Sequence, residues 1–335
     1  MKIFVNSTVG DLQCVLVSEK TGSHRVIAID VARAIVLIGM VVAHLYPFPG
    51  LAGEFFKGFP AALFAVLSGV SLYFMRKHSR QSVALRGAII AVLGLAIAPW
   101  AGPISVVLPA IGVGYILFGL LRVTGWSDRV LAIALAALVV ASGITRVIAL
   151  QTTLPAMLRE PYPLPGWLAY MLVGVLAGRV LLRNPQRQKM ALWGFPVAAV
   201  GIAARGWVDS QYAVATRNRA GIVVQGFVDA KPHSGGLIDL VATMAGSLAV
   251  IGVCVLVVKR GEWLFPLQAM GSMTLTIYAA HVLSVGLING ASTQQLYPIF
   301  TIVTLVAALA GATLWRSFFA RGALEAAVSA ICRKV

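Results

Sequence analysis

Ten apolar segments follow one another along this chain of 335 residues, separated by shorter polar connections. They lie at residues 26–46, 58–75, 87–100, 103–121, 130–150, 165–182, 190–208, 236–258, 267–289 and 297–319. Because a helix rises about 1.5 Å per residue, roughly 20 apolar residues cross the hydrocarbon core of a bilayer. We therefore predict an all-α fold, a polytopic integral membrane helix bundle with about ten transmembrane helices.

The composition supports a membrane protein and excludes several other classes. Hydrophobic residues make up 59% of the chain and charged residues 11%, with a mean hydropathy of +0.89. A soluble domain carries roughly 25% charged residues, so soluble globular, disordered and coiled-coil folds are excluded. We predict one transmembrane domain over residues 25–321, with tails at 1–24 and 322–335.

The few charges are strongly biased, with 27 Lys and Arg against 11 Asp and Glu and a formal net charge of +16. Of the 27 cations, 19 lie in alternate connections, at residues 1–25, 76–86, 122–129, 179–189, 259–260 and 316–334. The positive-inside rule then places these connections and both termini in the cytoplasm. The longest connection on the other side is about 209–235. The lipid bilayer is the expected partner, and so apolar a surface excludes nucleic acid.

Three ionisable residues, Asp30, Arg33 and His44, lie in the first apolar segment, where each costs about 2.5–3.5 kcal/mol to insert. At about 100° per residue, Arg33 and His44 differ by only ~20° around the helix axis and lie ~16 Å apart along it. Asp30 lies one turn before Arg33, a spacing that favours an ion pair. We expect one polar stripe that faces protein and runs between the two membrane sides. Alternatively, the pair only fixes helix packing and His44 donates to a carbonyl.

A second set of polar residues is predicted to gather on the outer side. It consists of Glu54, Arg146, Arg205, His233, Ser234, Asp239, Tyr278 and His281. His44 and His281 both lie inside apolar segments, and an imidazole near its neutral-range pKa can act as a general base. No histidine or cysteine pair has the spacing of a zinc site, so no metal is expected.

Two segments carry a family resemblance. Residues 25–44, with an Arg and a His separated by ten residues at Arg33 and His44, resemble the first helix of the transmembrane acyltransferase superfamily. That superfamily includes the acyltransferase-3, heparan-α-glucosaminide N-acetyltransferase and YeiB-like proteins. Residues 271–281 and 321–325 are similar to the C-terminal motifs of the YeiB-like group, although Gly-Ala replaces their Gly-Pro at 322–323.

The resemblance implies a membrane acyltransferase. Its donor would be acetyl-CoA or another acyl-CoA from the cytoplasm, bound by Arg33, which Asp30 orients. The catalytic candidates are His44, His281 and Glu54, and the other outer residues would bind the acceptor. The acceptor would be a hydroxyl or amine of an extracytoplasmic sugar or glycolipid in a bacterial envelope, next to the plasma membrane.

Two other functions fit the same observations. A ten-span transporter of a small solute would also place charges and histidines along a water-lined path. Against it stand the lack of an internal repeat and the concentration of the polar stripe in one helix. A non-catalytic envelope-assembly protein on the same fold is the third possibility, because a fold does not guarantee chemistry.

Overall fold

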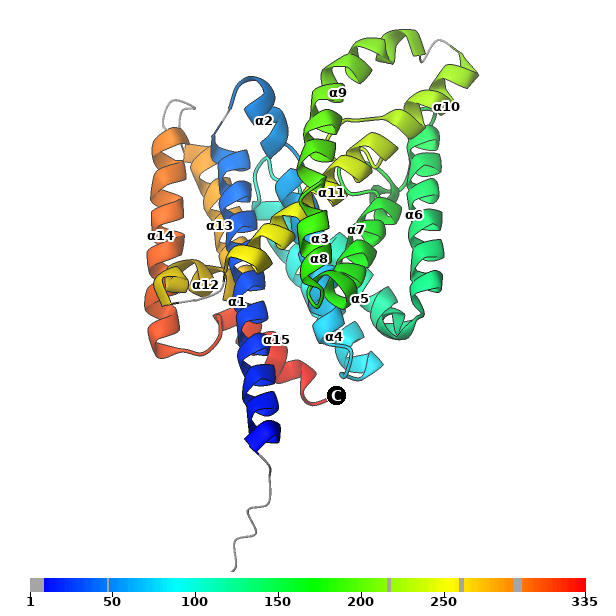
Figure 1. Ribbon diagram of the computed structural model, residues 1–335. Coiled ribbons are helices and arrows are strands. Elements are labelled where there is room, and N and C mark those ends of the chain that lie inside the picture. The colour runs from blue at the N-terminus through cyan, green and yellow to red at the C-terminus, as the bar shows by residue number, and fades with distance from the viewer. Residues whose placement is uncertain (1–8, 47, 216–217, 259–261, 292–296) are drawn as a thin grey trace, which may run out of the picture.

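Figure 1 shows the computed structural model, which describes residues 9–46, 48–215, 218–258, 262–291 and 297–335. Every regular element in these ranges is helical. The α-helices are α1 Val9–Leu45, α2 Gly50–Phe56, α3 Phe59–Phe74, α4 Arg80–Ile97, α5 Leu108–Leu120, α6 Asp128–Ala149, α7 Leu164–Leu176, α8 Pro185–Ala191, α9 Gly194–Ala215, α10 Arg219–Val228, α11 Leu237–Val257, α12 Phe265–Ser272, α13 Thr274–Ala291, α14 Tyr297–Phe318 and α15 Ala323–Cys332. Short 3-10 turns lie at Ala98–Trp100, Val123–Gly125, Ala156–Leu158 and Glu262–Leu264, and a π-helical turn at Ala177–Leu181.

Eight stretches of the described residues are long and apolar enough to cross a membrane. They are Ile27–Leu45, Gly53–Phe74, Arg80–Trp100, Asp128–Ala149, Leu164–Leu181, Pro185–Gln211, Leu237–Val257 and Pro298–Phe318. Each corresponds to one of the ten apolar segments of the sequence. The protein is therefore an all-helical integral membrane protein, and the two remaining segments, the fourth and the ninth, differ from a simple span.

The fourth segment, predicted as 103–121, is helical only over the 13 residues of α5. Gly102 has a φ of 59°, a left-handed conformation, and turns the chain together with Pro103. Residues 104–107 are irregular, and α5 begins only at Leu108. Inside a membrane, irregular backbone is tolerated where it is buried in protein or lines a cavity. Residues 104–107 are therefore expected to lie within the protein or beside a cavity.

The ninth segment, predicted as 267–289, is broken. α12 and α13 meet at Met273 with a bend of 80°. Figure 1 shows α12 lying crosswise between α14 and α1, whereas α13 stands alongside α1. A Cβ at Gly271 would lie 1.7 Å from the carbonyl oxygen of Asp30, so only glycine lets α12 lie this close to α1. Because the helix breaks here, the first turn of α13 is open: its backbone N–H groups have no partners within the helix.

The Glu325 side chain of α15 covers that open turn. Its Oε1 accepts hydrogen bonds from the backbone N–H groups of Leu275 (2.6 Å) and Thr276 (3.2 Å). Its Oε2 accepts from the hydroxyl of Thr276 at 2.6 Å. A carboxylate stabilises a helix N-terminus by pairing with unsatisfied N–H groups and with the positive end of the helix dipole. The C-terminal helix therefore fixes the position of α13.

Small residues bring the central helices together. A Cβ at Gly69 of α3 would lie 1.9 Å from the carbonyl oxygen of Met171, and one at Gly174 of α7 would lie 1.9 Å from that of Val66. α3 and α7 thus cross with their backbones in contact, as small residues allow in membrane bundles.

The basic connections meet at one end of the bundle, where the C-terminus lies in Figure 1 and which we call the basic end. Arg76, Arg80 and Arg122 line one surface depression there. Lys259, Arg260 and residues 1–8 lie outside the described residues. The opposite end, which carries α2 and α10, is called the outer end.

The predicted tails and the longest connection contain helices. α1 begins at Val9, and the segment 322–335 folds back as α15, where the hydroxyl of Ser82 donates to the carbonyl of Cys332 at 3.0 Å. Val328 and Cys332 of α15 are buried. Most of residues 209–235 is helical as well, because α9 reaches Ala215 and α10 follows. An apolar face on α10 and on α15 accounts for their difference from plain loops.

Candidate active site

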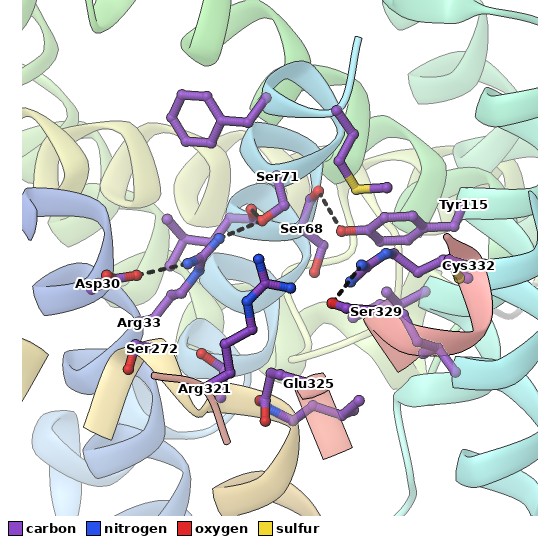
Figure 2. A pocket seen from close by; sticks show the side chains of 18 of the residues that line it. Asp30, Arg33, Ser68, Ser71, Tyr115, Ser272, Arg321, Glu325, Ser329 and Cys332 are labelled. Atoms are coloured by element: carbon purple, nitrogen blue, oxygen red, sulfur yellow. Dashed lines mark hydrogen bonds and ion pairs between the residues drawn. The ribbon is translucent and has the colours of Figure 1, made fainter. Parts of the chain in front are cut away.

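Two cavities open toward opposite ends of the bundle. The first, the basic pocket, has a volume of about 620 Å³. It is shown in Figure 2, and its polar lining residues include Asp30, Arg33, Ser68, Ser71, His78, Arg86, Tyr115, Arg316, Arg321, Glu325, Ser329 and Arg333. The second, the histidine pocket, has a volume of about 530 Å³. Its polar lining residues are His44, Glu54, Lys57, Ser105, Glu160, Tyr162, Asp209, Lys231, His233 and Tyr278.

Arg33 is held in a fixed position on the wall of the basic pocket. It donates to Asp30 Oδ1 at 2.8 Å and to Ser71 Oγ at 2.6 Å, as Figure 2 shows. The hydroxyl of Ser71 in turn donates to the carbonyl of Leu67 at 2.8 Å. The predicted ion pair between Asp30 and Arg33 is confirmed. Part of the guanidinium remains exposed to the cavity, so the pair orients a cation toward whatever enters.

The basic pocket has a large excess of positive charge. Five arginines line it against two carboxylates, those of Asp30 and Glu325. Both carboxylates are engaged, Asp30 by Arg33 and Glu325 by the first turn of α13. The pocket is therefore suited to an anion, and the guanidinium groups suit phosphate in particular because they donate two parallel hydrogen bonds.

His44 and His281 form a pair at the inner end of the histidine pocket. Nδ1 of His44 lies 2.9 Å from Nε2 of His281, within hydrogen-bond distance, and the rings are inclined by only 8°. His281 is buried, whereas His44 lines the cavity. Among the described residues, no side chain or carbonyl pairs with Nε2 of His44, which leaves that nitrogen for a ligand. The imidazole pair can therefore transfer a proton at the cavity wall.

Helix α1 connects the two pockets. Arg33, on its middle turns, faces the basic pocket, and His44, in its last turn, faces the histidine pocket. The predicted polar stripe along α1 is present, but its residues line two separate cavities. Their linings meet where Phe64 of the basic pocket stacks on Tyr278 of the histidine pocket, with ring centroids 5.6 Å apart.

His233 approaches the histidine pocket from the connection before α11. Its backbone has a φ of 65°, and its ring packs against Tyr162 and Trp167 at centroid distances of 5.5 and 6.1 Å. Desolvation by these surroundings, with smaller contributions from Arg205 and His44, lowers the pKa of His233 to about 4. At neutral pH it is an uncharged hydrogen-bonding group.

The outer carboxylate Glu54 lies on the rim of the same pocket. Its Oε1 accepts from Nζ of Lys57 at 2.8 Å, and its carbonyl accepts from Arg205. No hydrogen bond joins Glu54 to either member of the histidine pair within the described residues. A catalytic role for Glu54 stays a prediction, and its position favours contact with a ligand at the mouth of the pocket.

Four of the predicted ligand-binding residues lie behind the wall of the histidine pocket. They are Arg146, Arg205, Ser234 and Asp239, all buried. Arg146 pairs with Asp229 at 2.7 Å and with Glu160 at 2.6 Å. Arg205 donates to the carbonyl of Ala230 at 2.9 Å and lies 3.5 Å from Asp239, and Ser234 Oγ accepts from Gly236 N at 3.2 Å. These contacts hold the outer connections, and direct substrate binding by the four stays a prediction.

A model of the acyltransferase domain family designated acyltransferase-3 matches residues 104–316, more than half of the chain. The chain belongs to the acyltransferase-3 family. The family resemblance of the sequence is thereby confirmed. No curated protein and no solved structure matches this acyltransferase-3 chain.

The acyltransferase-3 match runs from the irregular segment before α5 into α14 and includes His233, Tyr278 and His281. Arg33 and His44 precede it, so the packing of α1, rather than the match, brings these two residues to the site. Family membership and the spanning helices together make the protein a membrane acyltransferase. Among the described residues, no group of three or more His, Cys, Asp or Glu side chains is placed to hold a metal ion.

Several residues of this acyltransferase-3 site were not expected as site residues. Arg86, Arg316 and Arg321 line the basic pocket, although the sequence indicates only that they lie in basic connections. Ser71 and Tyr162 are further examples, since a hydroxyl in an apolar or proline-rich segment gives no distinctive signal. The distribution of cations among the connections predicts at which end of the bundle the arginines lie. It does not predict which of them line the same pocket.

Proposed function

We propose that this protein transfers an acyl group, most simply acetyl, from cytoplasmic acyl-CoA to a hydroxyl or amine of an extracytoplasmic sugar or glycolipid. The observation that carries the proposal is the pair of opposed pockets, one lined by arginines and the other bearing an imidazole pair. On this proposal the basic end faces the cytoplasm of a bacterial cell and the outer end faces the envelope, as the positive-inside rule requires.

The basic pocket suits the donor. Coenzyme A carries phosphate groups at one end and a thioester at the other, joined by a long narrow arm. Its phosphates would pair with arginines such as Arg86, Arg316 and Arg321, which line the pocket. Arg33 is held by Asp30 and Ser71, so it would order the donor without a change of rotamer. The inner wall at Phe64 and Leu108 is apolar and suits the acyl end.

The histidine pocket suits the chemistry and the acceptor. Nε2 of His44 would take the proton from the acceptor hydroxyl or amine as the oxygen or nitrogen attacks the thioester carbonyl. The new bond to the acyl carbon forms, the carbon–sulfur bond breaks, and the imidazolium returns the proton to the departing thiolate. His281 holds Nδ1 of His44 and so fixes the ring, which makes His44 the base and His281 a positioning residue.

The rim of the histidine pocket provides hydrogen-bonding groups of both kinds for a sugar. Glu54, Glu160 and Asp209 can accept from hydroxyls, and the neutral His233 can either donate or accept. A hydroxyl-rich ligand needs a few convergent polar groups in a concave site of this size. This supports a sugar more than an apolar acceptor.

The test is a comparison of purified wild type with Arg33→Ala and His44→Ala for acetyl-CoA binding and for acetyl transfer to sugar acceptors. We expect weaker binding in the first variant and a loss of kcat with retained binding in the second. Arg129→Ala is the matched control, because Arg129 is an exposed arginine outside the basic pocket. A wild type that binds no acyl-CoA contradicts the proposal.

The transporter alternative is tested in the same preparation. Opposed pockets separated by a thin layer are also what a carrier for a small solute would show. Vesicles in which solute flux occurs, and in which no acyl group is transferred, would favour it. A protein that neither transfers acyl groups nor carries solutes would fit the non-catalytic envelope-assembly role.

A further inference from the structure

The two pockets are separated by a layer that is only one pair of aromatic rings thick. Phe64 lines the basic pocket and Tyr278 lines the histidine pocket. Their rings stack at a centroid distance of 5.6 Å and are inclined by 11°. The layer is equally thin at the neighbouring backbone. Val107 lines the histidine pocket, and the next residue, Leu108, lines the basic pocket. Phe64 and Tyr278 together are called the aromatic partition.

The two rings differ in how firmly they are held. The hydroxyl of Tyr278 accepts a hydrogen bond from the backbone N–H of Val107 at 3.2 Å, in the irregular segment that shortens α5. An N–H group without a partner is costly inside a membrane protein, so this bond ties the tyrosine ring in place. Phe64 has no polar atom and is held by packing alone. Phe64 is therefore the member that can turn aside.

The partition lies on the path that the proposed reaction requires. Tyr278 is three residues before His281 on α13, and His281 contacts His44. An acyl group that arrives from the basic pocket meets Phe64 before it reaches the imidazole pair. The space that opens when the phenyl ring turns then limits the size of the acyl group that reaches His44.

We propose that the aromatic partition determines acyl specificity, with Phe64 restricting transfer to short acyl groups and Tyr278 anchoring the partition. The inference rests on the proposed function. It predicts that wild type transfers acetyl in strong preference to butyryl. One extra methylene in a fitted apolar site is worth roughly 10–200-fold in discrimination, so two added methylenes provide a large window for measurement.

The first test measures kcat/KM for acetyl-CoA and butyryl-CoA with one acceptor. Phe64→Ala and the milder Phe64→Leu should lower the acetyl-to-butyryl ratio by at least about tenfold. Phe74→Ala is the matched control, because Phe74 belongs to the same helix and lines the same pocket but lies away from the partition. Its ratio should stay at the wild-type value. An unchanged ratio in both Phe64 variants, with transfer intact, overturns the partition while the proposed function stands.

The second test does not depend on acyl transfer. A cysteine is introduced by Ala61→Cys, in the histidine pocket, after Cys14, Cys254 and Cys332 are replaced by serine. In oriented vesicles, a small membrane-impermeant thiol reagent should modify position 61 from the outer end only. Adding Phe64→Ala should allow modification from the basic end as well. Modification from the basic end with Phe64 in place, or its absence after Phe64→Ala, overturns the proposal even if no acyl-CoA is used.

Discussion

Nδ1 of His44 lies 2.9 Å from Nε2 of His281, although the two residues are 237 positions apart in the sequence. The contact occupies one nitrogen of His44 and leaves the other directed at the cavity, whereas His281 is buried behind it. This difference in exposure, and not a difference in residue type, assigns the two imidazoles different functions.

The assignment predicts unequal effects of the two histidines. His44→Ala should reduce kcat by about 10²–10⁴-fold, the range typical of a general base, with little change in donor binding. His281→Ala should cost less, because it removes only the group that orients the base, and His281→Gln should recover part of the rate through its amide. Steady-state kinetics with acetyl-CoA separate the two. A larger loss for His281→Ala than for His44→Ala would reverse the roles.

Loss of the Asp30–Arg33 ion pair should weaken donor binding, which distinguishes a binding role from a role in helix packing alone. Asp30→Ala leaves the guanidinium with Ser71 as its remaining partner in the pocket, so we expect KM for the donor to rise by about tenfold with kcat little changed. If the pair serves helix packing alone, the variant will unfold at a lower temperature and KM will not move. Ser71→Ala should show the same direction with a smaller change.

Much of the first helix was predictable because helical spacing is a local property. The stripe of Asp30, Arg33 and His44 and its ion pair follow from residue intervals alone. The partner of His44 does not, because periodicity defines a face and not the helix that packs on it. The short α5 and the bend between α12 and α13 were also missed, since each depends on contacts with other segments.

The aromatic partition gave no sequence signal for a different reason. Phe64 and Tyr278 resemble any other core aromatics in apolar helices, and only the cavities on either side distinguish them. The arginines of the basic pocket were predictable only in part. Their side of the membrane was predicted from charge, but their convergence on one cavity depends on the fold.

The Glu325 cap predicts that the C-terminal helix supports the site from a distance. Glu325→Ala removes three hydrogen bonds from the first turn of α13, the helix of Tyr278 and His281. We expect a loss of about 1–2 kcal/mol in the free energy of unfolding and a lower transfer rate. Thermal melting in detergent measures the first effect. Asp128→Asn is the control, because its exposed ion pair with Arg179 should matter by less than about 1 kcal/mol. Equal melting of wild type and Glu325→Ala would contradict the cap.

The lowered pKa of His233 predicts that the stability of the protein depends on pH, with a defined sign. Its pKa is about 4 in the folded protein and near 6.5 in the unfolded chain. Above about pH 6.5 the imidazole is neutral in both states and adds no pH dependence. Between pH 6.5 and 4 the unfolded chain takes up a proton that the folded protein excludes, so stability falls as the pH falls, by up to about 3 kcal/mol.

Melting curves of wild type and His233→Asn between pH 7 and 4 test that sign, since asparagine tolerates the positive φ at this position. The variant should lose stability less steeply on acidification. His78→Asn, at an exposed histidine, should keep the wild-type slope. A steeper loss in His233→Asn than in wild type would mean that His233 is stabilised in its charged form.

The central claim is that the acyl group crosses from the basic pocket to the histidine pocket, and vectorial transfer in vesicles measures this directly. The protein is reconstituted with its basic end outward, acetyl-CoA labelled in the acetyl group is added outside, and a sugar acceptor is enclosed. We predict labelled acetyl-sugar inside the vesicles, at a rate reduced by about 10²–10⁴-fold in His44→Ala. Labelled product formed only outside, with enclosed acceptor untouched, would contradict the account.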